Sequence, residues 1–404
     1  MKISVPPSKS HTLRAILFGS LASKTSIIRN YLPSPDTQAM ICACRKLGAA
    51  IEEHPDYLMI QGKGLSAGDK EIDAGNSGQV LRFVGAVAGL MPTKTVITGD
   101  ASIRERRPVK PLVEGLQQLG ASATSINGSV IIQGPMRGGR ATIDGADSQP
   151  VSGLLIASAF AQGKTELFVQ NPGEKPWVGL TLSWFDRLGI AYNNHAFEKY
   201  EIPGHSQIEG FDYMVPGDWS SAAYPLAAAL IQGREVTVLN VDFLDAQGDK
   251  KIVDVLEKMG ARVYRGENSV TIYPGPLRGI RIDVNDLIDA ITILAVLGCF
   301  AEGKTTIVGG AIARKKESDR IASIAKELKK MGAKIEERED GLIVEPSPLK
   351  GVPVQSYSDH RMAMSLAVAA LGAEGETEID GNECVQKSYP GFFTMLKTFS
   401  QRSV

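Results

Sequence analysis

Apolar and polar positions alternate along this chain in a pattern that repeats. Six times, a run of small apolar residues ends in a tight turn, and a run of β-forming residues follows. Successive turns begin about 70 residues apart, and self-similarity at a fixed interval indicates a repeated structural unit. The six turns are Ser23-Lys24-Thr25, Thr93-Lys94-Thr95, Gly163-Lys164-Thr165, Gly233-Arg234-Glu235, Gly303-Lys304-Thr305 and Gly375-Glu376-Thr377.

A second marker recurs at nearly the same interval. It is a Leu or Met followed by Gly, and it stands at Leu47-Gly48, Leu119-Gly120, Leu188-Gly189, Met259-Gly260 and Met331-Gly332. Together the two markers show which residues of different repeats occupy equivalent places. A residue that differs from its equivalents in the other repeats is then a candidate for a catalytic or binding role.

The fourth repeat predicts the elements of the unit. Residues 220–232 are rich in Ala and Leu and predict a buried helix, and Val236–Leu239 predicts a strand. Asp249 can cap a second helix, which we expect to stop at Gly260. Residues 262–273 contain two β-forming runs and predict a hairpin. The unit is therefore strand, helix, strand, helix and hairpin.

Units of this length favour one fold class, α/β (α+β). The turn Asp340-Gly341 predicts the matching hairpin of the fifth repeat. Each unit buries one face of its sheet against its helices. Thin solenoids usually have shorter periods, of about 20–50 residues. We therefore expect two lobes of three βαβαββ units, each an inside-out α/β barrel with its helices inside. The boundary is expected near residues 215–218, with a cleft between the lobes.

Composition limits the chemistry that the chain can carry. Its 404 residues have a formal net charge of −1, so any anion site must be local. The four cysteines form no C-x-x-C pair, which favours reduced thiols and a cytoplasmic location. The five histidines form no metal-binding pattern, so no metal site is expected. The most apolar run, Ala290 to Ala301, is too short to span a bilayer and predicts a buried helix.

Short polar segments precede the apolar helix of each repeat. Capping is the ordinary interpretation of any one of them. If the repeats are equivalent, however, several helix N-termini face one place, and together they would attract anions. The segments are Pro7-Ser8-Lys9-Ser10, Gly75-Asn76-Ser77-Gly78, Asp147-Ser148-Gln149, Gly217-Asp218-Trp219-Ser220, residues 285–289 and Ser358-Asp359-His360-Arg361.

Basic residues occupy positions at which helix capping does not require a positive charge. Lys9, Arg14 and Arg361 lie in or just after these segments. Arg107 precedes Pro108, which restricts it to extended geometry. A further cluster is Lys315-Lys316-Glu317-Ser318-Asp319-Arg320. These positions predict cations directed at an anionic ligand.

One motif match is rejected. Residues 298–305 fit the phosphate-loop pattern G-x-x-x-x-G-K-[ST]. That loop must follow a strand and open a helix, whereas this stretch follows a predicted helix and opens a predicted strand. We therefore do not expect a nucleoside triphosphate site at these residues.

The whole chain resembles the 5-enolpyruvylshikimate-3-phosphate synthase family. Two strings are specific, Lys316-Glu317-Ser318-Asp319-Arg320 and Asp359-His360-Arg361-Met362-Ala363-Met364. Weaker matches occur in the expected order, and they are Pro7-Ser8-Lys9-Ser10 with Arg14, Gly75-Asn76-Ser77-Gly78 with Arg82, Arg107-Pro108, Ser148-Gln149, Gln247-Gly248-Asp249, Asp289-Ala290 and Lys387.

The resemblance implies an activity and a domain organisation. The reaction moves the enolpyruvyl group of phosphoenolpyruvate to the 5-hydroxyl of shikimate 3-phosphate and releases phosphate, a step towards chorismate and aromatic amino acids. Only these small molecules are implied as partners, without cofactor, metal, nucleic acid or membrane, and the protein is expected to be a monomer. The implied lobes are residues 9–216 and residues 1–8 with 217–404, with crossovers near Ser8 and Gly217.

The resemblance also implies roles for individual residues. Asp289 would take the proton of the 5-hydroxyl, and Glu317 or Lys387 would protonate the methylene carbon of phosphoenolpyruvate; Lys9 completes the catalytic set. The residues implied for phosphoenolpyruvate are Lys9, Gly78, Arg107, Gln149, Arg320, Arg361 and Lys387. Those implied for shikimate 3-phosphate are Lys9, Ser10, Arg14, Ser148, Gln149, Asp289 and Lys316.

Some positions differ from the family pattern, mainly on the sugar-phosphate side. Asp147 stands where a serine is usual, and Glu174-Lys175-Pro176-Trp177 replaces a Ser-x-x-Tyr stretch. Ile288 replaces a proline before Asp289, and Arg106 lies beside Arg107 and could compete for its role.

Three alternatives follow from the same residues. The sister transferase that acts on UDP-N-acetylglucosamine typically has a cysteine before its Arg-Pro, and residues 99–108 contain none. A non-catalytic repeat scaffold would have no reason to bring the basic and acidic candidates together. An RNA-end-processing enzyme with related repeats would need a basic exterior, which a net charge of −1 does not favour.

Overall fold

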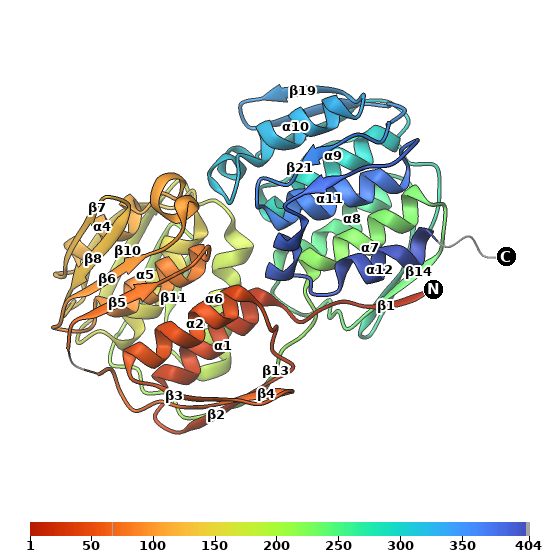
Figure 1. Cartoon of the computed structure of the whole chain (residues 1–404). Coiled ribbons are helices and arrows are strands. Elements are labelled where there is room, and N and C mark those ends of the chain that lie inside the picture. Colours follow the sequence, from red (N-terminus) through yellow and green to blue (C-terminus); the bar gives the residue numbers. More distant parts are fainter. Residues whose placement is uncertain (67, 401–404) are drawn as a thin grey trace. The chain divides into compact units, whose positions relative to one another are not determined.

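A computed structural model describes residues 1–66 and 68–400, which form two compact units (Figure 1). The N-terminal unit is Lys9–Val215. The C-terminal unit combines Met1–Ser8 with the described residues from Pro216 onward. Each unit has its own apolar core.

The strands of the N-terminal unit form four-stranded sheets. They are β2 (Thr25–Arg29), β3 (Ala50–Glu53), β4 (Tyr57–Gln61), β5 (Lys70–Asp73), β6 (Thr95–Thr98), β7 (Ser122–Ile126), β8 (Ser129–Gln133), β9 (Gly139–Asp144), β10 (Thr165–Gln170), β11 (Asn193–His195), β12 (Lys199–Ile202) and β13 (Asp212–Met214). The sheet orders are β13-β2-β4-β3, β5-β6-β8-β7 and β11-β12-β10-β9.

The strands of the C-terminal unit pair in the same manner. They are β1 (Lys2–Ser4), β14 (Val236–Leu239), β15 (Arg262–Gly266), β16 (Ser269–Tyr273), β17 (Arg281–Asp283), β18 (Thr305–Val308), β19 (Lys334–Arg338), β20 (Gly341–Glu345), β21 (Val354–Gln355) and β22 (Ile379–Asp380). The orders are β1-β14-β16-β15, β17-β18-β20-β19 and β21-β22.

Each four-stranded sheet combines one parallel pair with an antiparallel hairpin. In the sheet of β17 to β20, for example, β17 runs parallel to β18, and the hairpin β19–β20 pairs antiparallel with β18. The hairpins predicted in the fourth and fifth repeats are therefore confirmed. The last sheet differs, because in the described residues the chain continues from β22 into helices rather than into a hairpin.

Two strands pair away from their sequence neighbours. β1 pairs in parallel with β14, and β13 pairs in parallel with β2. The chain consequently passes from one unit to the other at Ser8–Lys9 and again at Val215–Pro216. The Ser8 amide donates to the Pro216 carbonyl at 2.8 Å, so the two passing segments lie side by side.

Helices fill the interior of each unit. Those of the N-terminal unit are α1 (Lys9–Leu21), α2 (Pro35–Leu47), the π-helical turn η1 (Val80–Val84) with α3 (Gly85–Ala88), a second π-helical turn η2 (Ser102–Arg106), α4 (Lys110–Gln118), α5 (Ser148–Phe160) and α6 (Lys175–Leu188). Nearly every residue of α1 and α5 is buried, and α5 is accordingly made mostly of small and apolar residues on all sides.

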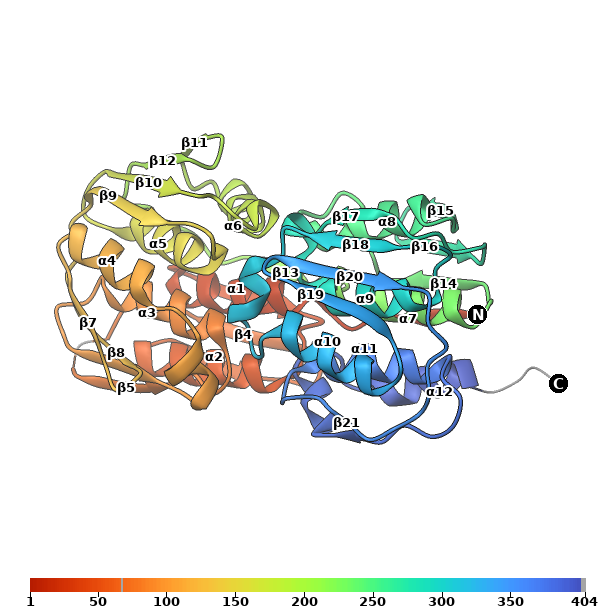
Figure 2. The same cartoon turned by 90° about the horizontal axis from the view of Figure 1, so that it is seen from above.

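The C-terminal unit follows the same rule. Its helices are α7 (Trp219–Ile231), η3 (Gly248–Lys251), α8 (Ile252–Lys258), η4 (Asn285–Ala290), α9 (Ile291–Phe300), η5 (Ala311–Lys315), α10 (Arg320–Lys330), α11 (His360–Leu371), η6 (Asn382–Lys387) and α12 (Phe392–Ser400). Figure 2 shows α7, α9 and α11 together within this unit, where they contact one another. Among the described residues, no helix combines the length and apolarity needed to cross a membrane.

The Leu/Met-Gly marker has a backbone explanation. All five glycines have a positive φ, between 68° and 118°, and follow the end of a helix. A residue with a Cβ is strained in this conformation, so the repeat keeps glycine there.

Asp249 does not cap a helix as expected. It lies inside the 3₁₀ turn η3, and α8 begins only at Ile252. Its carboxylate turns inward and accepts a hydrogen bond from the Ser220 hydroxyl. The rejected phosphate-loop match joins the end of α9 to the start of β18, so the predicted helix-to-strand context of these residues is confirmed.

We predict that Gly260→Ala destabilises the protein more than Gly233→Ala. Both glycines have positive φ, 112° and 62°, and the left-handed backbone alone costs alanine about 1–2 kcal/mol. A Cβ at Gly260 would also collide with the Pro276 carbonyl oxygen, whereas a Cβ at Gly233 would meet open space. Urea unfolding of both variants measures the difference, and equal losses would contradict the collision.

Candidate active site

Arg320 is the centre of a buried ionic network in the C-terminal unit. It is the first residue of α10, and its side chain is 2% exposed. Nη1 donates to Asp289 Oδ1 at 2.6 Å, Nη2 to Glu317 Oε2 at 2.9 Å, and Nε to Asp359 Oδ2 at 2.8 Å. Burial alone would lower the pKa of Arg320, but the charges of Asp359, Glu317 and Asp289 outweigh it and raise this pKa.

Asp289 is held between two arginines. It lies in η4, and Arg361 Nη2 donates to its Oδ2 at 3.1 Å. Burial would raise the pKa of Asp289, but the charges of Arg361, Arg320 and Lys316 outweigh it and lower this pKa. Asp289 is therefore an ionised carboxylate at neutral pH.

Glu317 and Lys387 form the second pair of the network. Lys387 Nζ lies 2.9 Å from Glu317 Oε1, and each side chain is 8% exposed. Glu317 precedes α10, and Lys387 ends η6. The other Glu317 oxygen accepts from Arg320, so one carboxylate joins two cations.

Asp359 fixes the start of α11. Its Oδ1 accepts from the Arg361 amide at 2.9 Å as the N-cap, and its Oδ2 accepts from Ser318 Oγ at 3.0 Å. Because the same carboxylate binds Arg320, it connects the starts of α10 and α11. Asp359 was not among the predicted site residues, although its position before His360-Arg361 at a helix start was a signal.

The N-terminal unit brings a second set of predicted residues together around Gly78. A Cβ at Gly78 would lie 2.8 Å from both Arg82 Nη1 and Gln149 Oε1, and would overlap Arg107 Nη1. Arg107 is buried, whereas Arg106 is exposed. The structure therefore places Arg107, and not its neighbour, at this point.

Lys9 and Ser10 lie at the start of α1 in the same unit. Lys9 Nζ is 3.3 Å from Asp36 Oδ2, and Ser10 Oγ accepts from Gln79 Nε2 at 3.1 Å. Gln79 follows Gly78, so these contacts connect α1 to the Gly78 cluster. Lys316, in the other unit, is buried and contributes its charge to Asp289.

Arg14 is committed to contacts within its own unit. Nε donates to Thr181 Oγ1 at 3.0 Å, Nη1 to the Ser10 carbonyl at 3.1 Å, and Nη2 to the Trp177 carbonyl at 3.2 Å. Its guanidinium also lies over the Phe83 ring. Burial lowers the pKa of Arg14 to about 9.

Ser148 donates to a neighbouring carboxylate. Its amide and hydroxyl both lie 3.0 Å from Glu174 Oε2, and Glu174 is 1% exposed. Asp147 caps α5 through the Gln149 amide at 3.0 Å and lies 3.3 Å from Arg82 Nη2. Arg82, four residues after Gly78, was not among the predicted site residues; that helical spacing was the available signal.

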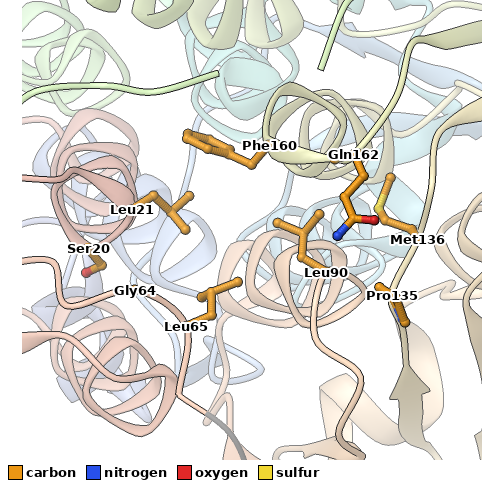
Figure 3. Close-up of a pocket in the computed structure, with 10 residues that line it drawn as sticks. Ser20, Leu21, Gly64, Leu65, Leu90, Pro135, Met136, Phe160 and Gln162 are labelled. Atoms are coloured by element: carbon orange, nitrogen blue, oxygen red, sulfur yellow. The ribbon is translucent and has the colours of Figure 1, made fainter. Parts of the chain in front are cut away.

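The pocket in Figure 3 lies at the other ends of the same helices. Its volume is about 230 Å³, and its lining includes Leu21 and Phe160, the last residues of α1 and α5. Its lining has no charged side chain. A wall of this kind does not suit a small anion that carries several charges. Among the described residues, no group of three or more His, Cys, Asp or Glu is placed to bind a metal ion.

The family model for EPSP synthase (3-phosphoshikimate 1-carboxyvinyltransferase) matches residues 1–396. The chain belongs to the EPSP synthase family. A Chlamydia pneumoniae protein named 3-phosphoshikimate 1-carboxyvinyltransferase is 42% identical over 406 residues, which cover 98% of this chain and 91% of the relative. An Acetivibrio thermocellus protein with the same name is 42% identical over 400 residues, covering 98% and 94%.

A solved structure of EPSP synthase from Acinetobacter baumannii has the same overall architecture. The TM-score is 0.82 at 30% identity, with 98% of this chain and 95% of that chain covered. The mixed α/β class is thereby confirmed. The chain is a transferase of the shikimate pathway, as its family membership and named relatives show.

We predict that Arg320→Lys lowers the free energy of unfolding by about 3 kcal/mol, because one ammonium cannot satisfy three buried carboxylates. Arg29→Lys is the matched control, since Arg29 pairs with Asp212 at the exposed surface. That control should change stability little. Chemical denaturation measures both variants, and equal stability of Arg320→Lys and the parent would contradict the network.

Proposed function

We propose that this chain transfers the enolpyruvyl group of phosphoenolpyruvate to the 5-hydroxyl of shikimate 3-phosphate. The observation that carries the proposal is the buried contact of Arg320 and Arg361 with Asp289. It combines cations for an anionic substrate with an ionised carboxylate that can accept a proton.

The proposed binding of phosphoenolpyruvate rests on hydrogen-bond donors of Arg361. Among the described residues, Arg361 Nε and Nη1 are buried without a hydrogen-bond partner. A guanidinium fork suits the carboxylate or phosphate of phosphoenolpyruvate. Arg320 and Lys387 would add charge from the C-terminal unit. Lys9, Gly78, Arg107 and Gln149 would complete this side from the N-terminal unit, with Gly78 leaving room for the ligand.

The shikimate 3-phosphate side requires an exchange of partners. Ser148 would bind this substrate with Lys9, Ser10, Gln149, Asp289 and Lys316, but its two donors now contact Glu174. The Glu174 carboxylate would have to withdraw before a phosphate oxygen replaced it. Arg14 could bind the substrate directly only if it gave up its hydrogen bond to Thr181 or to Trp177. Otherwise its role would be to hold α1 in place through these contacts.

The proton transfers follow from the charges. Asp289 would accept the proton of the 5-hydroxyl as that oxygen bonds to phosphoenolpyruvate. Glu317 or Lys387 would deliver a proton to the methylene carbon, which becomes a methyl group in the addition product. One of these two groups would then remove a proton from that methyl carbon as the bond to phosphate breaks, which restores the double bond of the enolpyruvyl group. Such acid–base help contributes about 10²–10⁴-fold, so positioning must supply much of the remaining acceleration.

The domain interpretation is also a proposal. Residues 9–216 and residues 1–8 with 217–404 would be two lobes, with crossovers of the chain near Ser8 and Gly217. Repeated sheet order and buried helices support six related units arranged as inside-out barrels. The cytoplasmic location and monomeric state expected from the sequence remain predictions.

We predict that Asp289→Asn and Glu317→Gln each reduce turnover by about 10²–10⁴-fold. Lys9→Ala should also reduce turnover far more than stability. The assay is phosphate release from phosphoenolpyruvate with shikimate 3-phosphate as acceptor. Asp286→Asn is the matched control, because this more exposed acid of η4 pairs with Lys251.

If a variant kept the turnover of the parent protein, the catalytic role proposed for the substituted residue would be wrong. The same assay with UDP-N-acetylglucosamine tests the sister reaction. Phosphate release with that acceptor, and none with shikimate 3-phosphate, would overturn the proposed substrate.

We predict that a phosphoenolpyruvate analogue binds about 5–150-fold more tightly once shikimate 3-phosphate is bound, which is a typical range of coupling between ligand sites. The reason is that Lys9 and Gln149 are assigned to both substrates, so the first ligand would order side chains that the second also needs. Titration calorimetry with and without shikimate 3-phosphate measures this coupling, and identical affinities would contradict these shared roles.

A further inference from the structure

Asp249 is a buried acid that the proposed proton transfers do not use. It lies in η3 and is 1% exposed. Its Oδ2 accepts the Ser220 hydroxyl, whereas Oδ1 has no hydrogen-bond partner among the described residues. An ionised carboxylate buried with one oxygen unsatisfied is costly, because it has lost water without replacement. The neutral acid avoids most of that cost.

The groups around Asp249 favour the same form. Asp289 on η4 and Asp218 at the start of α7 are negative, and Arg361 on α11 is positive. Burial raises the pKa of Asp249 to about 8, and the charge of Asp289 adds to this rise, while Arg361 and the Ser220 hydrogen bond oppose it. Two adjacent carboxylates rarely both ionise without enough positive charge.

The lysines of the same turn do not supply that charge. Lys251 Nζ lies 2.5 Å from Asp286, and Lys250 Nζ donates to the carbonyls of Phe243 and Asp245. Arg361 is therefore the cation for which Asp249 and Asp289 would compete. It already contacts Asp289 at 3.1 Å.

We propose that Asp249 is a positioning residue that stays protonated in the working enzyme and so leaves Arg361 to Asp289 and the substrate anion. This role rests on the proposed function, in which Arg361 binds phosphoenolpyruvate. When Asp249 loses its proton, a second negative charge attracts Arg361 and repels the incoming anion. The affinity for phosphoenolpyruvate then falls while the chemical groups remain in place.

The test is the pH profile of KM for phosphoenolpyruvate and of kcat. In the parent, KM should rise about tenfold from pH 7 to pH 9, as expected for loss of one required proton near pH 8. Asp249→Asn cannot ionise, so its KM should rise less than about twofold over that range. Asp254→Asn, on α8 at the surface with Arg265, should keep the parent profile. A tenfold rise that persists in Asp249→Asn would overturn the proposal.

Ser220→Ala provides an independent variant if Asp249→Asn does not fold. Removing this hydrogen bond removes an influence that lowers the pKa of Asp249. The rise in KM should therefore begin at higher pH, which a merely structural role of Ser220 would not produce. An unchanged or lower onset would overturn the assignment.

Infrared spectroscopy of the substrate-free protein separates this inference from the proposed function. The parent near pH 6.5 should show the C=O band of a protonated carboxylic acid, and Asp249→Asn should lose one such band. If the band is present but no transfer occurs, the proposed function fails and the protonation of Asp249 stands. If Asp249→Asn loses no band, the inference fails whatever the activity.

Discussion

A buried guanidinium that must satisfy three carboxylates is the constraint on which the C-terminal unit depends. Asp289, Glu317 and Asp359 come from η4, from the loop before α10 and from the start of α11, and Arg320 contacts all of them. Planar donors with fixed directions allow few arrangements of three acceptors. The contact therefore fixes three chain segments at once. Removing any partner would leave a buried charge unmatched, so the arrangement is demanding as well as specific.

The same arrangement keeps the site ready for anions. Arg320, Arg361 and Lys387 would repel one another if buried alone, but Asp289 and Glu317 separate and hold them. Such contacts place side chains before the ligand arrives, which reduces the ordering that binding must impose. In the proposed function, a local cluster of this kind would let a chain with a net charge of −1 bind substrates that carry both a carboxylate and a phosphate.

Much of the fold follows from the sequence, because its causes are local. The apolar helices, the hairpins after Met259-Gly260 and Met331-Gly332, and the order of elements all reflect periodicity and backbone preference. The pairing of β1 with β14 and of β13 with β2 does not, because it joins segments that lie far apart in the sequence. The inward orientation of the Asp249 side chain was missed for a related reason. The sequence alone does not distinguish an aspartate that caps a helix from one that is buried.

The same distinction between local and long-range causes applies to the candidate site. The residues of the C-terminal unit converge as motif spacing suggested, whereas the sugar-phosphate residues are already engaged by neighbours that no motif contains. Ser148 contacts Glu174, and Arg14 contacts Thr181. In the proposed function, binding on that side would therefore exchange one hydrogen bond for another, which leaves little net gain per contact. Most of the net attraction would then come from the C-terminal unit, where Arg361 Nε and Nη1 have no hydrogen-bond partner among the described residues.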